Sequence, residues 1–268
     1  MNFFYEAPEQ IEPRPISFDA CALLLRRFRK FVSLDAADIA AVEHLLRNRR
    51  RMQAHEMLVR EDSKPDRVYL MTGGIGFRYR FLPDGRRQIF GYLLPGELCD
   101  TAFVISNACD HNVGLLCDAE VAVINPAELM TTMVNHPRIE RGLLMMALGD
   151  AAIMREWLLN LGQRDALHKM AHFFCEMITR LEAAGAVEAD GSYALPITQN
   201  ELADTLGLTV VHVNRTLQRL RHDSVLEWSR RRFKVLDWAL LAAVGGFNSN
   251  YLALEERPVE PRLNAYGC

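Results

Sequence analysis

The chain has 268 residues, of which 50% are hydrophobic and 24% are charged, and its formal net charge at pH 7 is −3. These values are typical of a globular protein with one large domain or two medium ones, and they exclude a disordered or collagen-like chain. No apolar run approaches the roughly 18 residues of a membrane helix, and the N-terminus lacks the basic and then apolar order of a signal peptide. We therefore expect a cytoplasmic protein that does not contact a membrane.

The cysteines lie at positions 21, 99, 109, 117, 175 and 268, with no Cys-x-x-Cys pair among them. This spacing indicates neither a zinc site nor a disulfide framework, so we expect reduced thiols and no metal.

Residues 52–130 have the pattern of short strands separated by turns. Turn-forming residues recur at short intervals between runs that are rich in β-branched and aromatic residues. The clearest unit is a hairpin over residues 77–92, whose alternation predicts one buried face and one solvent-exposed face. Helical periodicity in segments 18–31 and 35–50 predicts two flanking helices. We expect a small antiparallel barrel or sandwich.

Residues 136–161 change to helical periodicity and predict one long helix. Its apolar stripe contains Ile139, Leu143, Met146, Ile153 and Trp157. The stripe fits a buried helix of a monomer or a homodimer interface, and we expect the interface because one barrel covers only part of so apolar a helix. Asp150 falls on the same stripe, where its carboxylate would need a partner in a dimer core.

A further amphipathic helix is predicted over residues 166–183. It carries His168 and His172 one turn apart, a spacing that can hold a metal ion. No third ligand is visible and Lys169 lies alongside, so we interpret the pair as part of a solvated face.

Residues 198–213 contain the most specific motif of the chain. Thr198 and Glu201 are spaced as a capping box, which begins a helix. Ala203, Gly207 and Val213 then stand at the small-residue, turn-glycine and buried positions of a helix-turn-helix. Thr209 caps the second helix, residues 210–221.

An outward polar and cationic face is predicted for this second helix. With residues 100° apart, Val213, Leu217 and Leu220 form its buried stripe. The outward face has Val211, Arg215 and Gln218 at its centre and His212, Asn214 and Arg219 at its margins. Residues 225–236 predict a two-stranded wing with an arginine-rich tip.

Charge is concentrated in this part of the chain. Residues 205–235 contain seven Lys and Arg and two acidic residues, a formal charge of +5, so the remainder carries −8. A basic tip on an acidic body is attracted to DNA phosphates in one orientation. A functionless solvated face would explain the charge alone, but not its combination with the helix-turn-helix and the wing.

The order of barrel, long helix and winged helix-turn-helix resembles the Crp/Fnr family of bacterial transcription regulators over about residues 24–244. The motifs that carry the resemblance are Leu94-Pro95-Gly96-Glu97-Leu98, Asn160-Leu161 and Ile197-Thr198…Glu201-Leu202…Leu206-Gly207-Leu208-Thr209…Val213-Asn214-Arg215. The resemblance implies an α+β fold with an N-terminal antiparallel jelly-roll barrel of cyclic-nucleotide-binding type. It also implies a homodimer that binds double-stranded DNA and contacts RNA polymerase, usually as an activator.

On this basis the chain divides into a sensor domain at 1–135, a dimerisation helix at 136–162, a winged helix-turn-helix at 163–250 and a tail at 251–268. The resemblance implies that Val211, Asn214 and Arg215 read DNA bases. The residues expected on the DNA backbone are Thr198, Gln199, Thr209, His212, Gln218, Arg219 and Arg231. Family members commonly have a glutamate at position 211 that reads cytosine, so valine there should remove the cytosine requirement while Arg215 keeps its guanine.

The sensor departs from the cyclic-nucleotide-binding members. Those members follow a Gly-Glu motif with an Arg-Ser pair that neutralises the cyclic phosphate, whereas segment 107–112 here reads Asn-Ala-Cys-Asp-His-Asn. We therefore expect neither cAMP nor cGMP as the ligand. The residues expected to line a ligand pocket are Gly96, Glu97, Cys99, Asp110 and His111.

The cysteine and histidine positions bear on two other cofactors, an iron–sulfur cluster and haem. Iron–sulfur members have clustered N-terminal cysteines, but only Cys21 precedes the barrel, so no iron–sulfur cluster is expected. Haem is the open alternative, because the chain has residues of the axial-ligand types, namely Cys109, His111, Cys117 and Met130. Isolated residues of these types in a barrel more often serve packing, which is the interpretation we favour.

An enzyme is not expected, because the chain contains no GxSxG, HExxH, Walker or dinucleotide-binding motif. The alternative to a transcription regulator is a cyclic-nucleotide-type regulatory module of a signalling complex, such as a kinase subunit. Specific binding to DNA distinguishes the two classes.

Overall fold

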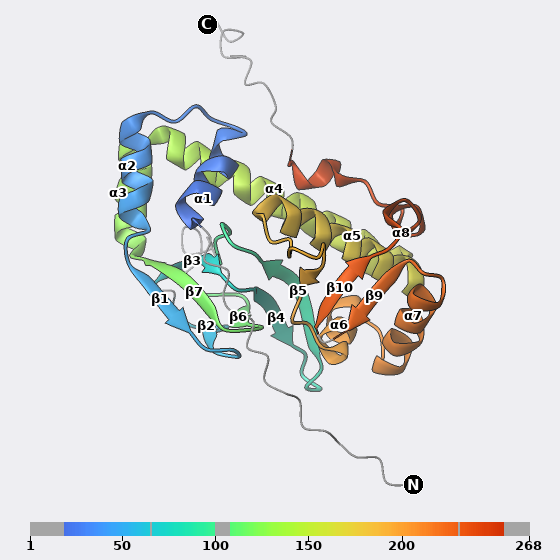
Figure 1. The fold of residues 1–268 in the computed structure, drawn as a ribbon. Helices are drawn as coiled ribbons and strands as arrows, with labels where there is room; N and C mark the ends of the chain where they lie inside the picture. The colour runs from blue at the N-terminus through green and yellow to red at the C-terminus, as the bar shows by residue number, and fades with distance from the viewer. Residues whose placement is uncertain (1–18, 65, 100–107, 230, 255–268) are drawn as a thin grey trace, which may run out of the picture.

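The computed structural model describes residues 19–64, 66–99, 108–229 and 231–254. A β-rich N-terminal part is joined by one long helix to a helical C-terminal part with a small sheet (Figure 1). The predicted α+β class and the order of its parts are confirmed. Within the described ranges, no helix combines the length and the apolar character needed to cross a membrane.

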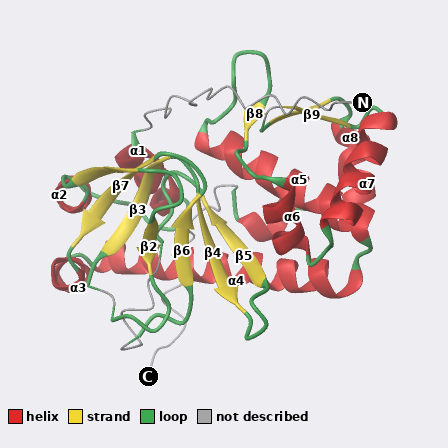
Figure 2. Cartoon of the chain, turned by 90° about the horizontal axis from the view of Figure 1, so that it is seen from below, coloured by secondary structure: helices red, strands yellow, loops and turns green. Residues whose placement is uncertain are grey.

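The N-terminal part begins with helices α1 (Ala20–Arg29) and α2 (Ala36–Leu45). Two antiparallel sheets follow (Figure 2), with strand orders β1-β7-β3 and β2-β6-β4-β5. Their strands are β1 (Arg49–Met52), β2 (Met57–Val59), β3 (Val68–Gly73), β4 (Gly76–Phe81), β5 (Arg87–Leu93), β6 (Asn112–Leu115) and β7 (Ala119–Ile124). The helix predicted to reach residue 50 ends at Leu45, because Arg49 and Arg50 pair with β7 in the sheet.

The predicted hairpin is formed by β4 and β5, with Phe77 opposite Tyr92 and a bulge after Arg78. The two faces differ as the alternation predicts, because Arg80 on the polar face is exposed, although Arg78 is half-buried, whereas the apolar face is covered. Phe77 and Tyr79 are buried in a hydrophobic core that also contains residues of the C-terminal helices. The face is covered because the C-terminal part packs directly against the hairpin.

Helix α3 (Pro126–Asn135) leads into the long helix α4 (Pro137–Gln163), which confirms the predicted long helix. Close packing of α4 on α1 depends on a glycine. A Cβ atom at Gly142 would lie 2.6 Å from the ring of Phe28, so a larger residue there would separate the two helices.

The residues predicted to form the dimer interface lie on the inward side of α4. Ile139, Leu143 and Met146 are buried in the core shared with α1 and α3, and Trp157 is buried against α5. Ile153 is half-buried. The prediction for this stripe therefore needs correction, because the subunit itself already covers most of its surface.

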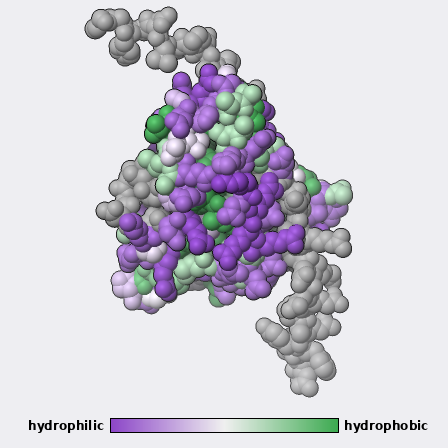
Figure 3. Space-filling model, turned by 90° about the vertical axis from the view of Figure 1, so that its left-hand side faces the viewer, coloured by the Kyte–Doolittle hydropathy of each residue, from purple (hydrophilic) through white to green (hydrophobic). Residues whose placement is uncertain are grey.

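The outward side of α4 carries a second set of apolar side chains. More than half of each is exposed: Leu144, Leu148, Met154, Leu158 and Leu159. In contrast, the surface over α2 and α3 is mostly hydrophilic (Figure 3). The exposed apolar face of α4 is thus the part of the long helix that is available to a partner.

The C-terminal part begins with α5 (Ala166–Ala184), which ends at Gly185 in the left-handed conformation. The other elements are β8 (Tyr193–Ala194), α6 (Gln199–Leu206), α7 (Val210–His222), β9 (Leu226–Ser229), β10 (Arg232–Val235), α8 (Trp238–Gly245) and a 3-10 helix, η2 (Ser249–Leu252). Strand β8 adds a third strand to the predicted two-stranded wing, in the order β8-β10-β9.

Candidate functional site

The turn between α6 and α7 has the local geometry that its residues predict. Thr198 Oγ1 accepts a hydrogen bond from the backbone N–H of Glu201 at 3.2 Å, and the Glu201 carboxylate accepts from the N–H of Thr198 at 2.7 Å. Gly207 adopts φ +63°, and Thr209 caps α7 by accepting from the N–H of His212 at 3.3 Å. These contacts set the angle between the two helices.

Helix α7 buries one face and presents the other. Val213, Leu217 and Leu220 are buried, as predicted. The predicted outward residues are all exposed: Val211, His212, Asn214, Arg215, Gln218 and Arg219. The side chain of Arg215 has no hydrogen bond or ion pair with another described residue, so its guanidinium is available to a partner.

Two residues at the margins of this face are already held. Asn214 Nδ2 donates to Gln199 Oε1 at 3.3 Å, which joins α7 to the start of α6. Arg219 Nε lies 3.8 Å from an Asp223 carboxylate oxygen, an exposed pair that contributes little to stability. The centre of the face is therefore less constrained than its edge.

An open groove of about 490 Å³ lies between the wing and the helix-turn-helix. It brings together three residues that were predicted on the DNA backbone, Thr198, Gln199 and Arg231. The other predicted backbone residues, Thr209, His212, Gln218 and Arg219, do not line this groove and lie exposed on α7 or at its cap. Arg231 has φ +62° at the tip of the wing, and the guanidinium of Arg221 donates to the carbonyl of Trp228 in the groove wall.

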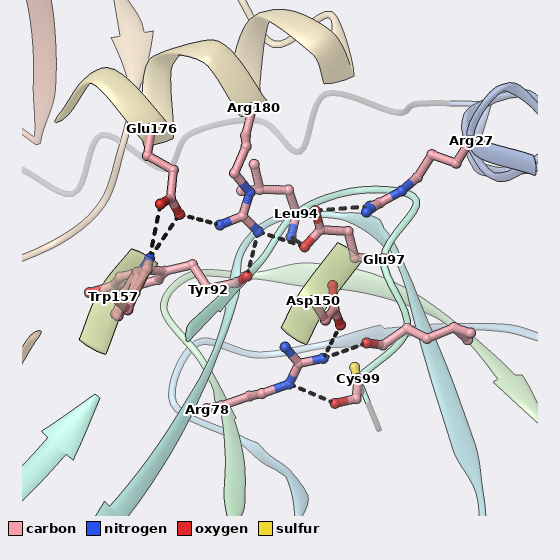
Figure 4. Close-up of polar contacts among 11 residues, drawn as sticks. Arg27, Arg78, Tyr92, Leu94, Glu97, Cys99, Asp150, Trp157, Glu176 and Arg180 are labelled. Atoms are coloured by element: carbon pink, nitrogen blue, oxygen red, sulfur yellow. Dashed lines mark hydrogen bonds and ion pairs between the residues drawn. The ribbon is translucent and has the colours of Figure 1, made fainter. Parts of the chain in front are cut away.

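In the sensor, Glu97 is engaged by two arginines. Its carboxylate lies 2.9 Å from Arg27 Nη1 on α1 and 2.8 Å from Arg180 Nη2 on α5, and it accepts from the N–H of Leu94 at 3.1 Å (Figure 4). Burial opposes ionisation, but Arg180 and Arg27 outweigh it and lower the pKa of Glu97 to about 2. Glu97 is thus an ionised member of the contact between the barrel and α5.

Arg180 is the centre of this contact. Its Nη1 donates to Glu176 at 3.1 Å and its Nη2 donates to the carbonyl of Tyr92 at 2.8 Å. Glu176 also accepts from Trp157 Nε1 at 3.0 Å, and burial raises its pKa although Arg180 opposes this shift. We call Arg27, Glu97, Glu176 and Arg180 the charged joint, because they connect α1 and the barrel to α5.

Asp150, which had no partner from the sequence alone, pairs with the barrel. Arg78 Nη2 on β4 lies 3.3 Å from its carboxylate and also donates to the carbonyl of Leu98 at 3.0 Å (Figure 4). A second polar link joins the hairpin to α6: Arg87 Nε lies 2.8 Å from Asp204. Both pairs hold the hairpin against the rest of the chain.

The predicted ligand-pocket residues have different surroundings in the structure. The cavity that Glu97 lines contains none of Gly96, Cys99, Asp110 and His111. Cys99 is buried in the barrel core, whereas 82% of the Asp110 side chain is exposed. The buried His111 Nδ1 lies 2.7 Å from Asp110, and its Nε2 has no hydrogen-bond partner among the described residues. Glu97 is held toward α1 and α5 by Arg27 and Arg180. Asn107 lies outside the described residues.

The two histidines of α5 also separate. His168 is exposed beside Asp165, with 2.7 Å between its Nδ1 and the carboxylate. His172 is buried, with Nδ1 3.1 Å from the carbonyl of Gly245 and Nε2 3.1 Å from the hydroxyl of Tyr251. The prediction of a solvated face is therefore wrong for His172, because α8 and η2 cover it.

Sequence reasoning did not predict the charged joint or the Arg87–Asp204 pair. Glu176 and Arg180 did leave a local signal, because they stand one turn apart beside the apolar stripe of α5. The sequence instead predicts their partner Glu97 in a ligand pocket. Nothing local connects Glu97 with Arg27 or Arg180, which are far away in the sequence.

Comparison with known proteins agrees with this division of the chain. Residues 49–136 match the family model of the cyclic nucleotide-binding domain, and residues 168–244 match that of the Crp-like helix-turn-helix domain. The second match favours a transcription regulator over a signalling module without DNA binding.

Curated relatives extend over most of the chain. The transcriptional activatory protein AadR of Rhodopseudomonas palustris is 30% identical over 182 residues, which are 68% of this chain and 74% of that protein. The nitrogen fixation regulation protein FixK of Bradyrhizobium diazoefficiens is 29% identical over 87% of this chain and 96% of its own length. The structure of FixK2 from Bradyrhizobium japonicum has the same fold, with a TM-score of 0.66 and 24% identity over 74% of this chain and 96% of that one.

Both family domains are matched, and relatives cover most of the chain. These matches agree with the barrel, the long helix and the capped helix-turn-helix of the structure. The chain belongs to the Crp/Fnr family of DNA-binding transcription regulators.

Proposed function

We propose that the protein is a homodimeric transcriptional activator that reads a palindromic DNA site through α7, and that its sensor ligand is not a cyclic nucleotide. The single observation that carries the DNA-reading part is the exposed face of α7, at whose centre Arg215 has no partner among the described residues. Several of the relatives are named as transcriptional activators, which supports activation and contact with RNA polymerase.

We assign base reading to Val211, Asn214 and Arg215. Arg215 has the planar guanidinium that can donate two hydrogen bonds to guanine O6 and N7. Val211 is 69% exposed and can make only apolar contact, most naturally with a thymine methyl group. We assign DNA-backbone contacts to the groove residues Thr198, Gln199 and Arg231 and to Thr209, His212, Gln218 and Arg219 on α7 and its cap.

Dimerisation supports the palindromic site, because two copies of α7 then read two half-sites. Members of this family are typically dimers. The exposed apolar face of α4 is the surface we assign to the dimer, in place of the buried stripe. The division into sensor domain 1–135, dimerisation helix 136–162, winged helix-turn-helix 163–250 and tail 251–268 remains part of the proposal.

The sensor residues support a ligand other than a cyclic nucleotide. Segment 108–112 contains no arginine, and its exposed Asp110 would repel a cyclic phosphate. Glu97, which the family's motif would place on the nucleotide, is neutralised by Arg27 and Arg180 instead. Binding a nucleotide through Glu97 would require breaking two ion pairs, of which the pair with Arg180 is buried.

Selection of binding sites from random duplexes tests DNA reading. Arg215→Ala should lose about 1–3 kcal/mol on the preferred site and accept any base at one position of each half-site. Val211→Glu should shift the preference toward cytosine next to that guanine, because its carboxylate can accept from cytosine N4. Arg219→Ala is the control, since a phosphate contact should weaken all sequences equally. If the Arg215→Ala protein selects the wild-type site unchanged, Arg215 does not read a base.

A further inference from the structure

A small cavity lies where the sensor meets the C-terminal part. Its volume is about 70 Å³, and its walls come from α1, the loop before Glu97, the middle of α4, the end of α5 and the segment after η2. It is separate from the groove beside the wing and from the buried barrel residues Cys99 and Cys109. None of the DNA-reading residues touches it.

The polar lining of this cavity is mainly cationic. Four cationic side chains and one carboxylate line it: Arg26, Arg27, Lys30, Arg180 and Glu97. Arg27 and Arg180 share Glu97, whereas Arg26 forms no ion pair with another described residue. Arg180 also has an unmet donor, because its buried Nε makes no hydrogen bond within the described part of the chain. Arg26 and the Nε of Arg180 therefore offer positive charge and hydrogen-bond donors at this cavity that no other described residue satisfies.

The remaining lining is apolar, and it includes one glycine, Gly149 of α4. Leu23, Phe31, Leu94, Met145 and Leu252 are among the apolar lining residues. Gly149 lies in the interior of α4, where glycine lowers helix stability relative to alanine. A Cβ atom at Gly149 would meet no other atom within 4 Å. Packing against a neighbour therefore does not explain this glycine, which instead leaves space at the cavity wall.

We propose that this cavity binds a small monocarboxylate with a short hydrocarbon chain. A bound water needs roughly 10–15 Å³ of such volume, so the cavity has room for a ligand of about five or six non-hydrogen atoms. The cationic residues would bind the carboxylate, and the apolar lining would cover the hydrocarbon chain. Inorganic phosphate matches the charge but leaves the apolar lining without a partner. A cyclic nucleotide is far too large.

Isothermal titration calorimetry of the full chain with sodium butyrate tests the proposal, with sodium phosphate as the second probe and sodium chloride to match ionic strength. We expect saturable binding of one butyrate per subunit and none of phosphate. Arg26→Gln should weaken butyrate binding about tenfold, the loss expected for one charge-assisted hydrogen bond. Gly149→Leu should abolish binding, because its side chain fills the cavity without changing charge.

Arg29→Gln is the matched control, since it removes the same charge from an exposed position of α1 that does not line the cavity. Thermal unfolding without ligand shows whether each variant is folded. The proposal is wrong if butyrate does not bind, if phosphate binds in its place, or if binding survives Gly149→Leu in a folded protein. These measurements contain no DNA, so their outcome is independent of the proposed DNA recognition.

Discussion

The outward face of α7 and the charged joint both contain arginines, but they use them in opposite ways. Arg215 is exposed and has no partner among the described residues, whereas Arg180 is buried and contacts two carboxylates and a carbonyl. An exposed cation keeps its hydration and costs little to fold, while a buried one needs partners within the protein. The difference teaches that substitutions in the joint should change folding, and that substitutions on outward faces should change association.

The largest effect is expected at the exposed apolar face of α4, which is an outward face like that of α7. Leu148→Glu combined with Leu158→Glu should convert the dimer into monomers, because each buried carboxylate costs several kcal/mol without a partner. Sedimentation equilibrium measures the change. Val134→Glu is the control, since Val134 is 75% exposed on α3. A double variant that stays dimeric would place the interface elsewhere.

A loss of about 3–5 kcal/mol in the free energy of unfolding is expected for Arg180→Met, which leaves Glu97 and Glu176 buried without their common cation. Urea unfolding measures it. Arg87→Met is the control, because Arg87 pairs with Asp204 at a partly exposed position and should cost about 1 kcal/mol or less. Equal losses of unfolding free energy in the two variants would mean that the buried charged joint contributes no more to stability than the partly exposed Arg87–Asp204 pair.

The pH dependence of stability should also identify the joint. The pKa of Glu97 is about 2 in the folded protein and 4.5 for the ordinary group, so its ionisation favours folding above about pH 4.5. This contribution, up to about 3 kcal/mol by the same linkage, should be lost as the pH falls toward 2. The difference in the free energy of unfolding between wild type and Glu97→Gln, measured by urea unfolding at pH 6, 4 and 3, should become smaller as the pH falls. If this difference is the same at all three pH values, the pKa of Glu97 is not lowered in the folded protein.

The smallest effect is expected at the wing. Arg231→Ala should weaken binding to specific and random duplexes by a similar factor. It should reduce the slope of log K against log salt by about 0.9 for each subunit, or about 1.8 for the dimer, as one phosphate per subunit is no longer neutralised. Fluorescence anisotropy over a series of salt concentrations measures both quantities. Arg86→Ala on the barrel hairpin should leave the slope unchanged. A loss confined to the specific site would mean that Arg231 reads bases.

Local spacing was enough to predict the helix-turn-helix and its faces. The capping box of Thr198 and Glu201, the turn at Gly207 and the cap at Thr209 each depend on residues within four positions of one another. The exposed face of α7 followed from helix periodicity, because its buried side is apolar and its outward side is polar. In this part of the chain, the polarity pattern distinguishes inside from outside.

The same reasoning failed on α4, because both of its sides are apolar. Leu143 and Leu144 are adjacent and chemically identical, yet the first is buried against α1 and the second is exposed. Periodicity predicts a helix from such a pattern but cannot tell which side the subunit covers. For the hairpin of β4 and β5, alternation predicts that the face of Phe77 and Tyr79 is buried, but it does not predict that the C-terminal helices cover that face.

The sequence by itself determined the order of the parts, the helix-turn-helix and the cationic face of α7, because these depend on neighbouring residues and on charge. Only the tertiary structure decided the outward side of α4 and the role of Glu97. Its two cationic partners, Arg27 on α1 and Arg180 on α5, lie far before it and far after it in the sequence. No local pattern records such a contact, because a buried charge is paired by whichever groups the fold brings within reach.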